Sequence, residues 1–180
     1  MNEEYISTQI AVYKNSKTLL EFHDKLKVAS MYSYAHIHAD GEDNGDGRRK
    51  HSLIGILMKD YSGGTGDKAV TVKANISPEE AKFILSRITT GFSEYTFQQE
   101  KIFGQKDEKG YAQVTKVRFI RALKDSKGNA RKIPWYVEVE NGKGIPLKNA
   151  TGGTYMKSGS FISTGKVYAN LTDLDLFKLL

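Results

Sequence analysis

Two stretches of the chain, VKANISPEE at residues 72–80 and VYANLTDLD at residues 167–175, decide the fold because they follow one pattern. Each begins with the alternation of apolar and polar residues that is typical of a half-buried strand. Each continues through Ala-Asn-aliphatic to a hydroxyl residue, Ser77 or Thr172, that can cap a helix. Acidic residues follow, where they favour the positive end of a helix dipole. The chain therefore has two strand-to-helix junctions of the same kind.

The residues after each junction predict an amphipathic helix. Pro78 suits the first helical position of the first helix. The residues of that helix expected to face the protein core are Ala81, Ile84, Leu85 and Ile88. In the second helix the expected apolar stripe consists of Leu174, Phe177 and Leu180.

The match between the two halves extends upstream of the junctions. A Gly-Gly-Thr turn at 63–65 or 152–154 precedes each last strand, and runs at 53–58 and 133–139 read as the strands before it. Further upstream, each half has a hairpin candidate, 31–50 or 114–132, and a first strand, 6–13 or 92–103. The pattern predicts an α+β fold of two diverged ββββα repeats, residues 1–90 and 91–180, with antiparallel sheets in one compact pseudo-symmetric domain. Residues 16–27 fit either a short helix or a long second strand.

Composition limits the function classes. The chain has no Cys, which excludes disulfides, thiol catalysis and Cys-based metal sites. No apolar run approaches the length that spans a bilayer, and the first residues lack an apolar signal region, so we expect a cytoplasmic protein without a membrane partner. The net charge of +6 falls entirely on residues 91–180. A basic half favours an anionic partner such as nucleic acid, although a Lys-rich solvated surface explains the charge equally well.

A tandem unit of four strands and a helix resembles the Whirly and Pur-alpha group of single-stranded nucleic-acid-binding proteins over nearly the whole chain. No Lys-Gly-Asn-Ala-Leu-type Whirly signature is present, so the resemblance is one of architecture. It implies that a single strand lies across a sheet face, held by stacked aromatic and basic side chains. We expect this function, with DNA favoured over RNA.

Alternation in residues 31–39 places rings on one face of a strand, and basic residues alternate with apolar ones in residues 114–123. Each group also has a purely structural interpretation. The rings could pack against neighbouring strands, Trp135 could belong to the core, and the cations of the loop could simply be solvated. The residues predicted to contact nucleic acid are Tyr32, Tyr34, His36, His38, Arg48, Arg49, Lys116, Arg118, Arg121, Arg131, Lys132, Trp135, Tyr136, Tyr155 and Lys157.

Motifs for other chemistry are incomplete. His36-x-His38 lacks further ligands at metal-site spacing, and the Gly-rich turns lack the residues of a phosphate-binding or calcium loop. A hydroxyl-His-acid triad is recognised by geometry, so sequence order does not decide it. We expect a non-enzyme without metal or cofactor. The alternative function is a phage or mobile-element protein that inhibits a host nuclease such as a CRISPR effector. The partner would then be a nuclease or replication protein, and the short last helix leaves a homo-oligomer open.

Overall fold

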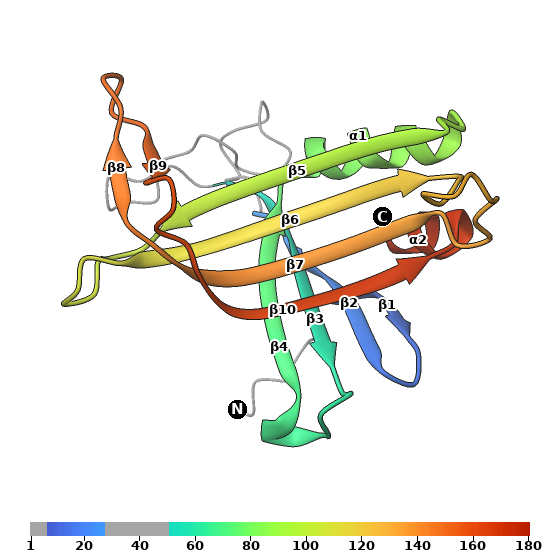
Figure 1. The fold of residues 1–180 in the computed structure, drawn as a ribbon, viewed down its shortest axis with the longest axis horizontal. Coiled ribbons are helices and arrows are strands. Elements are labelled where there is room, and N and C mark those ends of the chain that lie inside the picture. The colour runs from blue at the N-terminus through green and yellow to red at the C-terminus, as the bar shows by residue number, and fades with distance from the viewer. Residues whose placement is uncertain (1–6, 28–50) are drawn as a thin grey trace.

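The computed structural model describes residues 7–27 and 51–180, which form an α+β fold of antiparallel sheets with two helices (Figure 1). The first sheet has the strand order β1-β2-β3-β4 and is followed by helix α1 (Pro78–Thr89). A short 3-10 turn (Gly66–Lys68) precedes β4. The strands are β1 (Gln9–Lys14), β2 (Thr18–Lys25), β3 (Leu53–Asp60) and β4 (Val70–Ile76). Residues 16–27, left open above, therefore contain a strand, whereas the strand expected at 31–39 lies outside the described residues.

The second sheet has the order β10-β7-β6-β5 and ends in helix α2 (Asp173–Leu179). A two-stranded hairpin stands between β7 and β10, and Gly152 makes its turn with a positive φ of 83°. The strands are β5 (Glu94–Phe103), β6 (Ala112–Ala122), β7 (Trp135–Gly144), β8 (Pro146–Lys148), β9 (Thr154–Met156) and β10 (Ile162–Leu171). The strands predicted at 53–58, 92–103, 114–123 and 133–139 are present.

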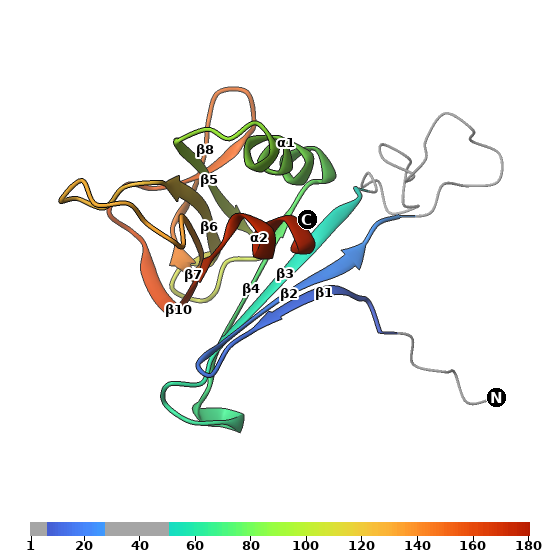
Figure 2. The ribbon, with the colours of Figure 1, turned by 90° about the vertical axis from the view of Figure 1, so that its right-hand side faces the viewer.

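The two sheets pack face to face with crossing strands, so that β4 runs across β7 and β10 (Figures 1 and 2). The core lies between them and is built from alternate residues of each strand, as a sheet with one buried face requires. Its largest buried members include Phe22, Ile56 and Met58 from the first sheet and Phe119 and Trp135 from the second.

Both predicted helix caps are present. The Ser77 hydroxyl accepts from Glu80 N–H, and the Glu80 carboxylate accepts from Ser77 N–H. Thr172 and Asp175 form the same reciprocal capping box at α2. The buried face of α1 contains Ala81, Ile84 and Ile88, as expected, and the fourth predicted residue, Leu85, is partly buried against the core.

The predicted stripe of α2 is wrong at two of its three positions, while the third residue, Leu180, is partly buried against the core. Leu176 and Leu179 are buried, whereas Leu174 and Phe177 are 60% and 49% exposed. The rotation of this helix is set by its first residue, Asp173, which is bonded to the second sheet. No helix among residues 7–27 and 51–180 is long and apolar enough to cross a membrane.

The bond that holds α2 is a bidentate ion pair. Arg121 Nε and Nη2 donate to the Asp173 carboxylate at 3.0 and 2.9 Å, and Trp135 Nε1 donates to the same group at 2.6 Å. Arg121 is only 5% exposed and Trp135 is fully buried. The hydrogen bonds from Arg121, which outweigh burial, lower the pKa of Asp173 from its usual value.

Candidate nucleic-acid interface

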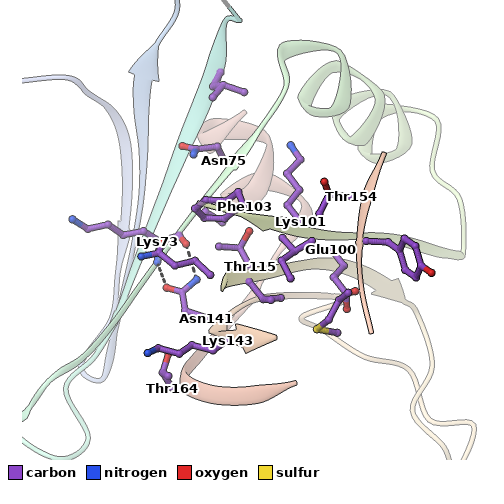
Figure 3. A pocket seen from close by; sticks show the side chains of 18 of the residues that line it. Lys73, Asn75, Glu100, Lys101, Phe103, Thr115, Asn141, Lys143, Thr154 and Thr164 are labelled. Atoms are coloured by element: carbon purple, nitrogen blue, oxygen red, sulfur yellow. Dashed lines mark hydrogen bonds between the residues drawn. The ribbon is translucent and has the colours of Figure 1, made fainter. Parts of the chain in front are cut away.

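A groove of about 810 Å³ lies where the inner face of the second sheet continues past the core (Figure 3). Strand β4 forms one side, and the ends of β5, β6 and β7 form the floor. Strand β9 of the hairpin stands on the opposite side. The floor residues Gln113, Thr115 and Asn141 share a face with the core residues of their strands but are polar. The groove is therefore the part of this sheet face that no second sheet covers.

Cations dominate the lining of the groove. Lys25, Lys73, Lys101 and Lys143 line it, and Glu100 is the one acidic lining residue among the described residues. Lys25 Nζ donates to Asn75 Oδ1 at 2.8 Å, and Lys143 pairs with Asp107 at 3.1 Å. In the described part of the chain, no carboxylate lies within 4 Å of Lys73 or Lys101. Lys101 lies on the inner face of β5 and offers its ammonium group inside the groove, whereas the Lys73 side chain alternates with the buried Val72 and Ala74 and extends beyond the β4 side (Figure 3).

The position of Lys73 is fixed by its backbone. Lys73 N–H donates to Asn141 Oδ1 at 2.8 Å, and Asn141 Nδ2 donates to the Lys73 carbonyl at 2.8 Å. Strand β4 is an edge strand of the first sheet. The Asn141 side chain thus satisfies two edge groups that would otherwise be unpaired and joins the two sheets at the groove.

Two aromatic residues contribute to the lining of the groove. Phe103 at the end of β5 is 46% exposed, and Tyr155 in β9 is 49% exposed. Exposed rings beside cations are what single-strand-binding surfaces use, because every base offers a face for stacking while phosphates need positive charge. Tyr155 is one of the predicted contact residues, and Lys157, another, is exposed just beyond β9.

Three further predicted residues, Lys116, Arg118 and Tyr136, share the outer face of the second sheet. Lys116 pairs with Glu100 at 3.3 Å and stands 3.7 Å above the Phe161 ring. Tyr136 stacks on the half-exposed Tyr168, with ring centroids 5.3 Å apart. These side chains are already engaged with protein partners.

Glu138 organises that outer face. It is 2% exposed, pairs with Lys166 at 2.7 Å and Arg118 at 3.4 Å, and accepts from the Tyr136 hydroxyl. Burial raises the pKa of Glu138, but Lys166, Tyr136 and Arg118 together bring it below its usual value. Burial and the Glu138 carboxylate raise the pKa of Tyr136. The two cations are largely neutralised, so this face is less suited to phosphate than the groove.

The remaining predicted residues are dispersed. Arg121 and Trp135 are buried in the α2 anchor, which corrects their assignment to an exposed binding surface. Arg131 and Lys132 are exposed in the β6–β7 connection, at the opposite end of the sheet from the groove. Six predicted residues lie outside the described residues: Tyr32, Tyr34, His36, His38, Arg48 and Arg49.

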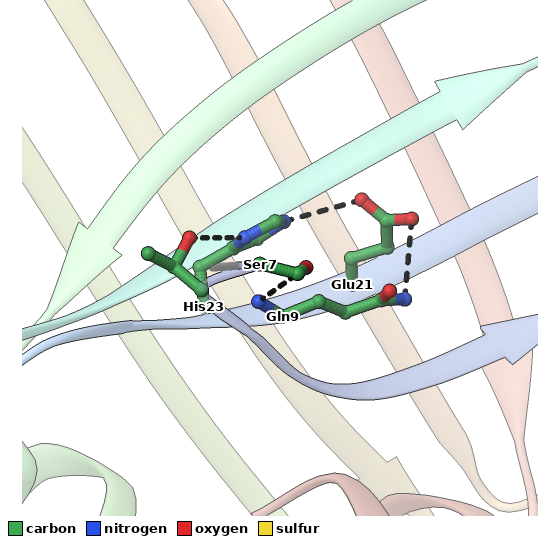
Figure 4. Close-up of polar contacts among 5 residues, drawn as sticks. Ser7, Gln9, Glu21 and His23 are labelled. Carbon is green, nitrogen blue, oxygen red and sulfur yellow. Dashed lines mark hydrogen bonds and ion pairs between the residues drawn. The ribbon is translucent and has the colours of Figure 1, made fainter. Parts of the chain in front are cut away.

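A hydroxyl-imidazole-carboxylate chain does occur at β1 and β2 (Figure 4). Thr8 Oγ1 lies 3.1 Å from His23 Nδ1, and His23 Nε2 lies 3.2 Å from Glu21 Oε2. None of the three side chains lines the groove. Gln9 Nε2 also donates to Glu21, at 3.3 Å. We interpret the chain as surface hydrogen bonding that ties β1 to β2.

Sequence reasoning missed five groove residues: Lys25, Lys73, Lys101, Phe103 and Lys143. The sequence held one indication of the groove. Tyr95, Phe97 and Lys101 are an even number of residues apart in one strand, so alternation places Lys101 on the same face as the two core-facing rings. A cation at such a position indicates that the core ends before it. No family model, curated protein or solved structure matches the chain.

Proposed function

We propose that the chain binds single-stranded nucleic acid, with DNA favoured over RNA, and that it consists of two diverged ββββα repeats, residues 1–90 and 91–180. The element order supports the second part. Four antiparallel strands in sequential order precede α1, and four strands precede α2, apart from the inserted β8–β9 hairpin. The shared capping boxes of α1 and α2 add to that support.

The groove carries the functional part of the proposal. It combines four lysines, one glutamate and two exposed rings in a space of about 810 Å³. Lys101 supplies positive charge for phosphates inside the groove, and Lys73 supplies it just beyond the β4 side, neither with a carboxylate partner among the described residues. Phe103 and Tyr155 supply rings on which bases stack. An unpaired strand exposes its bases to such rings, whereas a duplex keeps them stacked within itself. The proposal therefore includes a preference for single strands over duplex.

Fluorescence anisotropy with a fluorescein-labelled 20-nucleotide oligo-dT tests the proposal. The observed association constant should fall steeply with salt, because phosphate contacts release counterions from the strand. The Lys73→Gln/Lys101→Gln variant removes two contacts, so its salt slope should be about 1.4 smaller than that of the wild type. Tyr155→Ala or Phe103→Ala should each weaken binding by about 1–3 kcal/mol.

The matched control is Lys14→Gln/Lys178→Gln, which removes two exposed lysines that do not line the groove. It should keep the salt slope within about 0.5 of the wild-type value, since it changes net charge without removing a contact. Equal loss in both double variants would show that binding follows net charge rather than the groove. No binding to oligo-dT at low salt would overturn the proposed function. If a labelled 20-nucleotide oligo-U bound as tightly as oligo-dT, the preference for DNA over RNA would be overturned. If a 20-bp duplex bound as tightly, the preference for single strands would be overturned.

The nuclease-inhibitor hypothesis stays a prediction. No feature of the described residues specifies a nuclease surface, so the groove remains the better-supported basis for function.

A further inference from the structure

The end of the second sheet opposite the groove carries an exposed apolar surface, which we call the helix end. Here α1 and α2 lie side by side on the inner side of the sheet, and the connection between β6 and β7 projects from the same strand ends on the other side (Figures 1 and 2). Its apolar side chains, 38–60% exposed, are Phe83, Phe92, Leu123, Ile133, Leu174 and Phe177. Monomeric proteins seldom leave so many large apolar side chains exposed in one region unless something binds there.

Backbone hydrogen bonds show that these segments are neighbours. Leu123 N–H donates to the Ser93 carbonyl at 3.1 Å, next to Phe92. Ala122 N–H donates to the Pro134 carbonyl at 3.0 Å, next to Ile133. The Trp135–Asp173 hydrogen bond places the start of α2 beside the same strand ends. Leu174 and Phe177, three residues apart on α2, then share an exposed face.

A basic loop borders this apolar surface. Lys124, Lys127, Arg131 and Lys132 are exposed there. Asp125 is the only acidic residue of the loop, and its carboxylate accepts from the backbone N–H groups of Lys127 and Asn129 at 2.8 and 2.9 Å. The acid is therefore engaged in the turn, while the four cations point to solvent without a carboxylate partner within the described residues.

A fifth cation lies within the apolar surface itself. The Arg87 guanidinium carbon is 4.4 Å from the centre of the Phe83 ring and 4.6 Å from that of Phe92. Among the described residues, Arg87 Nε is buried without a hydrogen-bond acceptor. The two rings thus hold a positive charge among exposed apolar groups.

We propose that the helix end docks an acidic peptide segment that carries apolar side chains. An apolar centre with a charged rim is the usual plan of a protein interface, and a basic rim is complementary to acidic residues. The aliphatic side chains Leu123, Ile133 and Leu174 match peptide side chains, whereas bases stack on rings. The ten-residue strands separate this surface from the groove by about 30 Å, so it is independent of the proposed nucleic-acid site.

The test uses the full chain and a fluorescein-labelled peptide, Asp-Glu-Leu-Phe-Asp-Glu-Leu-Phe-Asp-Glu, in anisotropy titrations. The wild type should bind it with a Kd below about 100 μM at low salt, a modest affinity for a short segment that orders on binding. Arg131→Glu/Lys132→Glu and Phe177→Ser should each weaken binding at least 10-fold. Lys73→Glu/Lys101→Glu, the matched charge reversal in the groove, should leave peptide binding within 2-fold. Circular dichroism establishes that each variant is folded.

Four outcomes would overturn the inference. One is no saturable binding of the peptide, and another is equal loss in the helix-end and groove variants. The third is binding to vesicles with 30% phosphatidylserine but not to the peptide, which would make the surface a lipid site. A loss of oligo-dT binding in Arg131→Glu/Lys132→Glu as large as in the groove variant would likewise assign this end to nucleic acid. If the chain bound the peptide but not oligo-dT, the proposed nucleic-acid function would be overturned while the peptide site at the helix end would be supported.

Discussion

Removing the Asp173 carboxylate should release α2 from the second sheet. In the wild type, this carboxylate receives two hydrogen bonds from Arg121 and one from Trp135. The Asp173→Ala variant leaves the Arg121 guanidinium, 5% exposed, without its charge partner. Its Nη1 is already buried without a partner among the described residues, so the variant would leave all its nitrogen donors unsatisfied.

The expected loss of stability depends on how deeply each partner of the ion pair is buried. Breaking a buried ion pair by removing one partner costs about 3–5 kcal/mol, because the other charge stays buried. Asp173 itself is 44% exposed, so solvent screens the pair and water can reach the vacated position. We therefore expect the free energy of unfolding to fall by about 3 kcal/mol, at the low end of that range.

Urea unfolding, followed by circular dichroism and by the fluorescence of Trp135, the only Trp in the chain, measures the loss. With a slope of about 2–3 kcal/mol/M, the midpoint should move down by about 1–1.5 M. Glu100→Ala is the control, since its Lys116 pair is partly exposed at both ends and should contribute below about 1 kcal/mol.

A double-mutant cycle with Arg121→Met isolates the pair. Once the guanidinium is gone, Asp173→Ala should cost only about 1 kcal/mol, for the lost Trp135 bond and the lost charge at the helix start. The coupling energy would then be about 2 kcal/mol. A loss for Asp173→Ala no larger than that of Glu100→Ala, or a coupling near zero, would refute the view that this ion pair anchors α2.

Three further predictions concern the same fold. The pKa of Asp173 is lower in the folded state than its unfolded value near 3.8, so its contribution to the free energy of unfolding is full above that value and is lost as pH falls through the folded pKa. The stability difference between the wild type and Asp173→Asn should therefore shrink below about pH 4. Urea midpoints of both proteins at pH 7, 4 and 3 would measure this. Gly142→Ala should destabilise by about 2 kcal/mol or more, because a Cβ there meets the Ile162 carbonyl and the Phe161 ring; an unchanged thermal midpoint would contradict this. Ser77→Ala should cost about 1 kcal/mol through loss of the α1 cap, while the exposed Ser86→Ala stays within about 0.5 kcal/mol in the same unfolding assay.

Local features were predictable from the sequence because their causes are local. The Ser77 and Thr172 caps depend on residues three positions apart, and the strands of the second sheet follow alternation within ten residues. Residues 16–27 were ambiguous for a physical reason. Thr18, Leu19 and Leu20 are buried in succession in β2, so simple alternation is lost where this strand enters the sheet.

Features that depend on distant residues could not be predicted in the same way. The rotation of α2 is set by Arg121 and Trp135, which lie 52 and 38 residues before Asp173. Alternation correctly placed Lys116 and Arg118 opposite Val117 and Phe119. It could not show that Glu100 and Glu138 neutralise those cations, while Lys101 in the groove has no carboxylate partner among the described residues.

The groove itself has a simple origin in strand length. Strands of the second sheet have 10 or 11 residues and are about 33 Å long, whereas the four strands of the first sheet span about 15 Å from edge to edge. Because the sheets cross, the width of the four-stranded first sheet covers only the middle of these strands, and helices cover the end beside Tyr95 and Trp135. The other end must be polar to remain in water, which explains Gln113, Thr115 and Asn141 on the core side of their strands. The same requirement places lysines at that end, so the charge that would bind a phosphate follows directly from the mismatch between the two sheets.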